Sequence, residues 1–244
     1  MTSRRSLPRV GSVRPTRSGY WKTAVVALGV AMLSAAGLQA MGDGPPAKPT
    51  TTVLFDGKTL DGWKATDFSS PGRVKVDDGA IIMEEGNPMT GITTTRKDLP
   101  TVNYELTYEA RRIAGHDFFA AATFPVGKSF ITLVNGGWGG NVTGLSSLDG
   151  QDASENETTK GYSYKDRTWY RFRVRVTGDV IRCWIDDQQV VDVNYSNRQV
   201  RTRIETNMNQ PLGFATWEAG GALRKIEVRL LTPAEIAATK KPLD

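Results

Sequence analysis

The chain has 244 residues, of which 39% are hydrophobic and 23% are charged, so it is long enough to bury a substantial core. Its net charge of +5 comes from residues 1–50, where seven basic residues and one acidic residue leave the rest of the chain at −1. A nearly neutral body argues against nucleic acid as a partner. The single cysteine, Cys183, excludes an intramolecular disulfide bond and is expected to be a small buried side chain.

The first 41 residues have the layout of an export signal. A basic flank precedes the apolar run at residues 24–38, and small residues follow that run. The run is shorter than the roughly 20 residues of a membrane span; an uncleaved signal-anchor is the alternative. We therefore expect an exported protein that is periplasmic, secreted or on the cell surface, with a membrane contact only if the anchor is retained. Residues 42–51, rich in Gly, Pro and Thr, are expected to form a linker.

The folded body is expected to begin with short strands separated by turn residues. Two Asp-Gly turns follow a strand at residues 53–55, and Asp78-Gly79 predicts a hairpin. Residues 102–113 are predicted to form a longer strand, because Tyr, Leu, Tyr and Ala alternate there with polar and charged residues. Further strands are predicted at residues 73–77, 80–83, 91–95, 118–124, 130–134 and 142–145.

The clearest pattern in the chain lies at residues 167–193. Aromatic and β-branched residues alternate there with three arginines, which is the period of two of a half-buried strand. Turn residues at Gly178-Asp179 and again at residues 186–189 separate this run from two more apolar runs. The segment therefore predicts a three-stranded antiparallel meander.

The last part of the body is expected to supply two closing strands, at residues 212–217 and 223–231, and a short helix at residues 233–239. About a dozen short strands with almost no helix indicate an all-β fold, in which two antiparallel sheets pack face to face as a jelly-roll sandwich. The first and last strands are expected to pair. Residues 52–232 are therefore one domain, followed by a tail at residues 233–244.

Residues 135–160 break the strand pattern, and long irregular segments inside compact domains are often functional. Trp138, flanked by four glycines, is a candidate platform for the apolar face of a sugar ring; packing over the edge of the sandwich is the alternative. Acidic residues of this segment suit a divalent metal such as Ca²⁺, with Asp149, Asp152 and Glu155 as candidate ligands. Solvated loop carboxylates are the simpler interpretation.

Both ends of the domain carry motifs of a known family. The run Leu54-Phe-Asp-Gly-Lys-Thr-Leu-Asp-Gly-Trp63, together with Leu223-Arg-Lys-Ile-Glu-Val-Arg-Leu230, resembles the 3-keto-disaccharide hydrolase domain family. The resemblance covers residues 52–231, and residues 136–157 look like a secreted bacterial branch of that family. It implies a concanavalin A-like jelly-roll fold. Family members more often carry Gly-Asn-Ser-Gly where this chain has Ala114-Gly-His-Asp-Phe118.

The resemblance also implies cleavage of glycosidic bonds in sugars oxidised at C3. A C3 ketone acidifies the hydrogen on C2, so a base can remove it while the C1 substituent leaves, and water adds afterwards. Such a site needs a base near C2 and a cation or hydrogen-bond donor near the ketone oxygen. The candidate catalytic residues are His116, which is the only histidine, its neighbour Asp117, and Glu109.

Four residues are candidates for binding the sugar: Trp138, Arg111, Asn135 and Arg171. Glu109 and Arg111 share the polar face of one predicted strand, and Arg171 lies on the polar face of another. This face is expected either to line a sugar cleft or to carry cross-strand ion pairs on a solvated surface.

These observations predict an exported carbohydrate-active protein, with a glycoside hydrolase or lyase acting on 3-keto-glycosides as the leading hypothesis. The alternatives are a non-catalytic lectin-like module and a tethered surface interaction domain. An enzyme requires His116 and at least one carboxylate to converge in a cleft, whereas a lectin requires only an aromatic platform and hydrogen-bonding groups.

Overall fold

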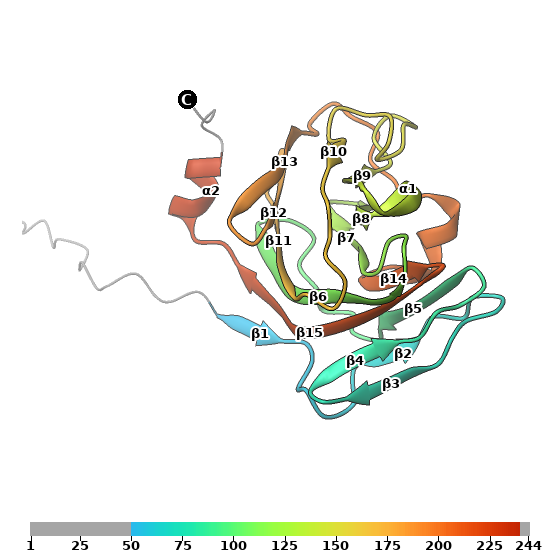
Figure 1. Ribbon diagram of the computed structural model, residues 1–244. Coiled ribbons are helices and arrows are strands. Elements are labelled where there is room, and N and C mark those ends of the chain that lie inside the picture. Colours follow the sequence, from blue (N-terminus) through green and yellow to red (C-terminus); the bar gives the residue numbers. More distant parts are fainter. Residues whose placement is uncertain (1–49, 240–244) are drawn as a thin grey trace, which may run out of the picture. The chain divides into compact units, whose positions relative to one another are not determined.

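The computed structural model describes residues 50–239, so the expected export signal at residues 1–41 lies outside the described part. Two antiparallel sheets, built from fifteen strands, pack face to face (Figure 1). The predicted all-β jelly-roll sandwich is therefore confirmed. Among residues 50–239, no helix has the length and apolar character needed to cross a membrane.

The first sheet has eight strands. Seven of them lie in the order β13-β12-β11-β6-β15-β4-β3, and β1 pairs with β15, which confirms the predicted pairing of the first and last strands. The predicted meander is β11-β12-β13. The strands are β1 (Thr51–Val53), β3 (Val74–Asp77), β4 (Ala80–Met83), β6 (Tyr104–Gly115), β11 (Tyr170–Val176), β12 (Val180–Ile185), β13 (Gln188–Asn194) and β15 (Ala219–Leu230).

The second sheet has seven strands in the order β10-β9-β8-β7-β14-β5-β2. These are β2 (Trp63–Ala65), β5 (Met89–Thr94), β7 (Ala121–Val126), β8 (Ser129–Gly136), β9 (Val142–Ser146), β10 (Lys160–Gly161) and β14 (Gly213–Trp217). Three short helical segments are α1 (Gly137–Gly140), the 3₁₀ helix η1 (Ile204–Asn209) and α2 (Pro233–Thr239), of which α2 was predicted. The sequence pattern missed β2 and β10, because two or three residues cannot show a period.

Aromatic side chains join the two sheets across the core. The Tyr108 ring of β6 stacks on that of Phe172 in β11, with 4.9 Å between centroids, and meets Phe214 of the second sheet at 4.8 Å. Each of these rings is fully buried, and burial of one such side chain stabilises the fold by about 1.5–3 kcal/mol. Cys183 is also buried, as predicted, and burial raises the pKa of its thiol.

Ion pairs cross three neighbouring strands on the outer face of the first sheet. The register places Glu105 of β6 opposite both Arg175 of β11 and Arg229 of β15. Its Oε2 accepts a hydrogen bond from Nη2 of Arg175, and its Oε1 accepts one from Nη2 of Arg229, each at 2.7 Å. Glu105 is only 4% exposed, so the two guanidinium groups replace the water that would otherwise solvate its charge.

Replacing Glu105 by glutamine should destabilise the domain. The change removes the β6 carboxylate that lies between Arg175 and Arg229 and pairs with both, and both guanidiniums are more than three-quarters buried. Breaking a largely buried pair costs about 3 kcal/mol. Urea unfolding followed by tryptophan fluorescence measures the loss.

The matched control is Glu84→Gln. Glu84 pairs with Lys75 at 3.4 Å, and its side chain is 45% exposed, so the control should cost less than about 1 kcal/mol. Equal losses in the two variants would contradict this account of the sheet face.

Candidate functional site

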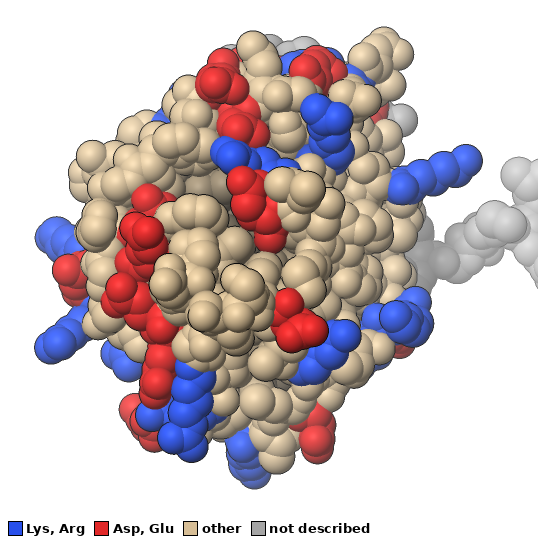
Figure 2. All heavy atoms as spheres, turned by 90° about the vertical axis from the view of Figure 1, so that its right-hand side faces the viewer, with Lys and Arg blue, Asp and Glu red and all other residues tan. Residues whose placement is uncertain are grey.

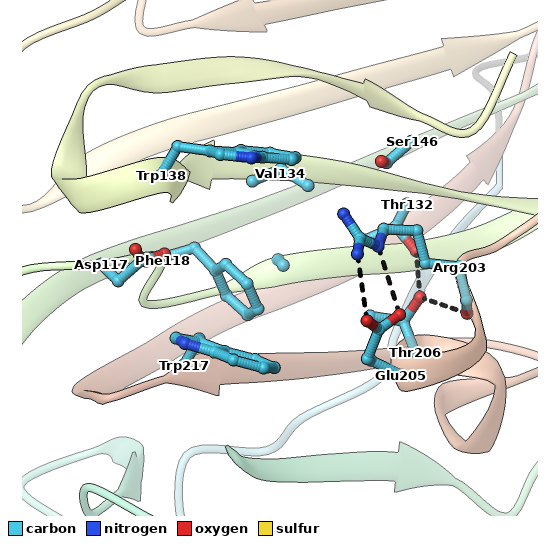
Figure 3. A pocket seen from close by; sticks show the side chains of 11 residues that line it. Asp117, Phe118, Thr132, Val134, Trp138, Ser146, Arg203, Glu205, Thr206 and Trp217 are labelled. Atoms are coloured by element: carbon cyan, nitrogen blue, oxygen red, sulfur yellow. Dashed lines mark hydrogen bonds and ion pairs between the residues drawn. The ribbon is translucent and has the colours of Figure 1, made fainter. Parts of the chain in front are cut away.

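A cleft of about 240 Å³ opens on the outer face of the second sheet (Figure 3). Strands β7, β8, β9 and β14 supply its floor, because alternate residues on each strand point away from the core. On β8, for example, Thr132 and Val134 line the cleft while Ile131 and Leu133 belong to the core. The lining residues are Asp117, Phe118, Ala121, Thr132, Val134, Trp138, Ser146, Arg203, Glu205, Thr206 and Trp217.

Aromatic rings form two opposite sides of the cleft. Figure 3 shows Trp138 on one side and Phe118 with Trp217 on the other. The Phe118 and Trp217 rings lie 6.2 Å apart between centroids, and the Trp217 amide donates a hydrogen bond to the Phe118 carbonyl oxygen. Trp138 is 45% exposed although it is a large apolar side chain. An exposed indole facing other rings across a cleft is suited to the flat apolar face of a ligand.

Backbone conformation and one carboxylate together place Trp138. The residue has φ 51° and is followed by Gly139 and Gly140, which also have positive φ; a β-branched residue could not adopt this conformation without strain. A Cβ on Gly140 would lie 2.5 Å from the His116 carbonyl oxygen. Asp117 accepts hydrogen bonds from the amides of Phe118 and Gly139, each at 2.7 Å. Asp117 therefore joins the two aromatic sides of the cleft.

A charged pair lies at one end of the cleft (Figure 3). Arg203 donates hydrogen bonds to both carboxylate oxygens of Glu205, at 3.2 and 3.0 Å, and to Oδ2 of Asp152 at 2.6 Å. A guanidinium has five N–H donors, so these three bonds leave two of them available. The Arg203 guanidinium also lies 5.9 Å from the centre of the Trp138 ring, which brings the charged end and the aromatic side together.

The charged pair shifts the ionisation of both partners. Burial opposes ionisation of Glu205, but the hydrogen bonds and positive charge of Arg203, together with a backbone hydrogen bond, outweigh it and lower the pKa of this carboxyl. The bonds to Glu205 in turn raise the pKa of Arg203, against the opposing effect of burial. Glu205 is therefore an ionised carboxylate at neutral pH, held beside a permanent cation.

Hydroxyl groups complete the floor beside this pair. The hydroxyls of Thr132 and Thr206 lie 3.0 Å apart, and Thr132 is also 2.9 Å from Thr123. The contact between Thr206 and Thr132 ties η1 to β8 beneath it, and Thr206 also donates to the Arg203 carbonyl oxygen at 3.3 Å at the start of η1. Rings, hydroxyls and a charged pair around one small cavity are the groups that bind a polyhydroxylated ring.

Two of the residues predicted from the sequence line the cleft, namely Asp117 and Trp138. His116 lies next to Asp117 in the turn that follows β6, but its side chain is exposed and is not part of the lining. Its carbonyl oxygen accepts a hydrogen bond from Nη1 of Arg112 at 3.1 Å. Asn135 is fully buried, and its side-chain oxygen accepts a bond from the Ala120 amide at 3.3 Å.

Three other predicted residues lie on the first sheet and not in the cleft. Glu109 of β6 accepts hydrogen bonds from Arg224 at 2.7 Å and Lys225 at 2.8 Å. Burial opposes its ionisation, but those two bonds outweigh it and lower its pKa. Arg111 stacks over Trp169 at 4.5 Å, and Arg171 pairs with Asp187 at 3.0 Å. The structure thus places these three residues in ion pairs and ring contacts on the first sheet, as the alternative interpretation expected, and not in the lining of the cleft.

The acidic residues of the irregular segment are held apart by different partners. Asp149 pairs with Arg198, Asp152 pairs with Arg203, and Glu155 accepts the Asp152 amide at 3.3 Å. Within residues 50–239, no three His, Cys, Asp or Glu side chains converge as metal ligands. The predicted ligand set of Asp149, Asp152 and Glu155 therefore does not form a common centre.

The charged end of the cleft was missed from the sequence. Residues 201–206 have no period of two or 3.6, so nothing in that run indicated which side chains would face a cavity. Trp217 was not among the predicted site residues either. It occupies the same face of β14 as Ala215, opposite to buried Phe214, and this alternation was the available signal.

Solved structures with the same fold belong to proteins of several kinds. The chain resembles domain 4 of AbnA, a GH43 extracellular arabinanase from Geobacillus stearothermophilus, with 15% identity over 80% of this chain and 98% of that one, and a TM-score of 0.50. A sialidase is 8% identical over 78% of this chain and 19% of its own, with a TM-score of 0.50. At such identities these two likenesses show the fold alone.

A carbohydrate-binding module, CBM66 from Bacillus subtilis, is 11% identical over 68% of this chain and 94% of its own, with a TM-score of 0.44. A search of the curated proteins found no match.

A comparison with protein families does give a match. The family model for the 3-keto-alpha-glucoside-1,2-lyase-like domain matches residues 50–229, which confirms the resemblance seen in the sequence motifs. The chain therefore belongs to the 3-keto-alpha-glucoside-1,2-lyase-like domain family.

Proposed function

We propose that this protein cleaves the glycosidic bond of sugars oxidised at C3, with Glu205 as the base and Arg203 as the group that stabilises the ketone oxygen. The observation that carries the proposal is the ionised Arg203–Glu205 pair at one end of an aromatic cleft. Membership of a carbohydrate-active domain family supports it. A cavity of about 240 Å³ lies below the roughly 300–1,000 Å³ of sites for drug-sized ligands, so it suits a single sugar ring.

The chemistry needs both members of the pair. Glu205 removes the proton from C2, which the neighbouring ketone has acidified, and the negative charge moves onto the ketone oxygen. The N–H groups of Arg203 that are not bonded to Glu205 or Asp152 stabilise this oxygen. The C1–O bond then breaks, and the leaving oxygen receives, through a water molecule, the proton that Glu205 removed from C2, which returns Glu205 to its carboxylate form. Water adds back with its hydroxyl at C1 and its hydrogen at C2, which completes a net hydrolysis.

The aromatic side chains of the cleft bind the substrate and keep it in place during this reaction; they are Trp138, Phe118 and Trp217. Their rings hold the apolar face of the sugar, and they exclude water from one side of the charged pair, which strengthens its electrostatic effect. Asp117 is a positioning residue in this scheme, because both of its oxygens accept backbone amides.

A carbohydrate-binding module is the second candidate function. The exposure of Trp138 and the pairing of Glu205 with Arg203 also suit a site that binds sugar without cleaving it. Binding without release of product, lost in Trp138→Ala, would favour this candidate.

The proposal includes two further expectations from the sequence, namely export of the protein and a bound divalent cation. Residues 1–41 would direct the protein out of the cytoplasm. The exported protein would then meet glycosides in the periplasm or outside the cell. A divalent cation such as Ca²⁺ stays a separate part of the proposal, which assays with and without EDTA test; because no ligand set converges within residues 50–239, the steps above depend on Arg203 and Glu205 alone.

Glu205→Gln should abolish most of the activity. Incubation of the protein with a disaccharide oxidised at C3 should release the second sugar, and the variant should release it about 10²–10⁴-fold more slowly, because the amide cannot accept the C2 proton. Chromatography of the released sugar measures the rate.

Two variants serve as controls for that assay. Glu84→Gln, on the other sheet, should keep the full rate. His116→Ala decides the earlier expectation, because an exposed turn histidine outside the lining should leave the rate within about twofold. A rate that falls with His116 and not with Glu205 would overturn the assignment of the base.

The rate should persist in mild acid. Glu205 acts as a base only when ionised, and its pKa lies below the ordinary value of 4.5, so activity should fall only when the pH drops below about 4.5. A pH–rate profile measured alongside circular dichroism, which confirms that the domain stays folded, provides the test. An acid limb centred near pH 6 would point to a different base.

A further inference from the structure

A second hollow adjoins the aromatic cleft. It has a volume of about 570 Å³, against about 240 Å³ for the cleft, and Arg203 and Glu205 line both. The peptide bond between Ser146 and Ser147 also connects them, because Ser146 lines the cleft and Ser147 lines the hollow. The charged pair therefore stands at the junction of two adjoining spaces.

Uncharged polar side chains form one wall of the second hollow. Thr202 donates to Asn207 and accepts a hydrogen bond from Gln210 at 3.0 Å, so amide and hydroxyl groups form one connected wall. Beside them, Arg201 makes no ion pair with any other residue in the 50–239 range, and its guanidinium lines the same space. Ile204, which is 81% exposed, supplies an apolar surface at the edge.

The surrounding surface does not favour a highly charged ligand. Figure 2 shows the face that carries α1 and η1, and acidic and basic side chains are interspersed over it without one large patch of either sign. A polyanion would require a dominant positive field. A neutral ligand rich in hydroxyl groups fits the amide, hydroxyl and guanidinium donors of the hollow better.

We infer that the second hollow binds the leaving part of the substrate, and that this substrate is a chain of three or more sugars whose oxidised end ring occupies the aromatic cleft. The inference rests on the proposed function. If about 240 Å³ holds one ring, a hollow of about 570 Å³ has room for two more. The bond that breaks then lies at the junction, beside Arg203 and Glu205.

The arrangement makes the enzyme act on chain ends. The cleft holds a single ring, so only a terminal oxidised residue can enter it, while the hollow accepts the sugars attached through the C1 oxygen. Binding energy from those sugars holds C2 and C1 against the charged pair. A substrate with a small leaving group does not reach the second hollow and lacks this binding energy.

Two substrates test whether the sugars beyond the cleaved bond contribute to the reaction. They are maltotriose, oxidised at C3 of its non-reducing ring, and methyl α-glucoside, oxidised at C3. The wild-type kcat/KM should be at least about tenfold higher for the trisaccharide. Arg201→Ala and Gln210→Ala should each lower the trisaccharide value several-fold and leave the methyl glucoside value unchanged. Arg73→Ala is the control, because Arg73 is exposed, precedes β3 in the other sheet and makes no ion pair within the described residues.

Equal kcat/KM values for the two substrates, or equal losses on both in the Arg201 and Gln210 variants, would overturn the inference while leaving the proposed function intact. If neither substrate is cleaved, the proposed function fails and calorimetry decides the inference. Maltotriose should then bind more tightly than methyl α-glucoside, and Arg201→Ala should remove that difference. Equal binding of both sugars would refute the subsite.

Discussion

Alternate side chains on β7, β8 and β14 serve opposite sides of the same sheet. Leu133 and Phe214 are fully buried in the core, while Thr132 and Trp217 on the same strands face the cleft. A strand cannot slip by one residue without exchanging these two sets. The apolar core therefore holds the cleft residues in register, and the free energy of core burial is what keeps the floor of the site rigid.

The residues to which we assign the proposed chemistry lie on irregular backbone above this floor. Arg203 and Glu205 flank the start of η1, and Trp138 belongs to a run of residues with positive φ. The Gly139 amide donates a hydrogen bond to Asp117, and the hydroxyl groups of Thr206 and Thr132 are hydrogen-bonded to each other, so both segments are tied to the domain. Rigid strands thus position the loops that carry the proposed site residues, as a rigid scaffold commonly positions binding and catalytic loops.

The fold was largely predictable because its signals are local. The alternation in β6 and β11 is visible in a few residues, and the family motifs lie at the two paired ends of the domain. The site was predictable only where the local sequence was unusual, as it is at Trp138, which is flanked by four glycines. Period two reveals that Glu109 and Arg111 share a face, but not which sheet of the sandwich carries the cleft. The approach of Arg203 to Trp138 depends on long-range packing, which no local pattern encodes.

The central claim is that cleavage proceeds by removal of the C2 proton beside the Arg203–Glu205 pair. Its most direct test is cleavage of a 3-keto-glycoside in deuterium oxide, with mass spectrometry and NMR of the released 3-keto sugar. The account predicts deuterium at C2 of that product, above the exchange seen with Glu205→Gln or with the product alone. Full retention of the original C2 hydrogen in a cleaved product would contradict it, because direct displacement at C1 leaves that hydrogen untouched.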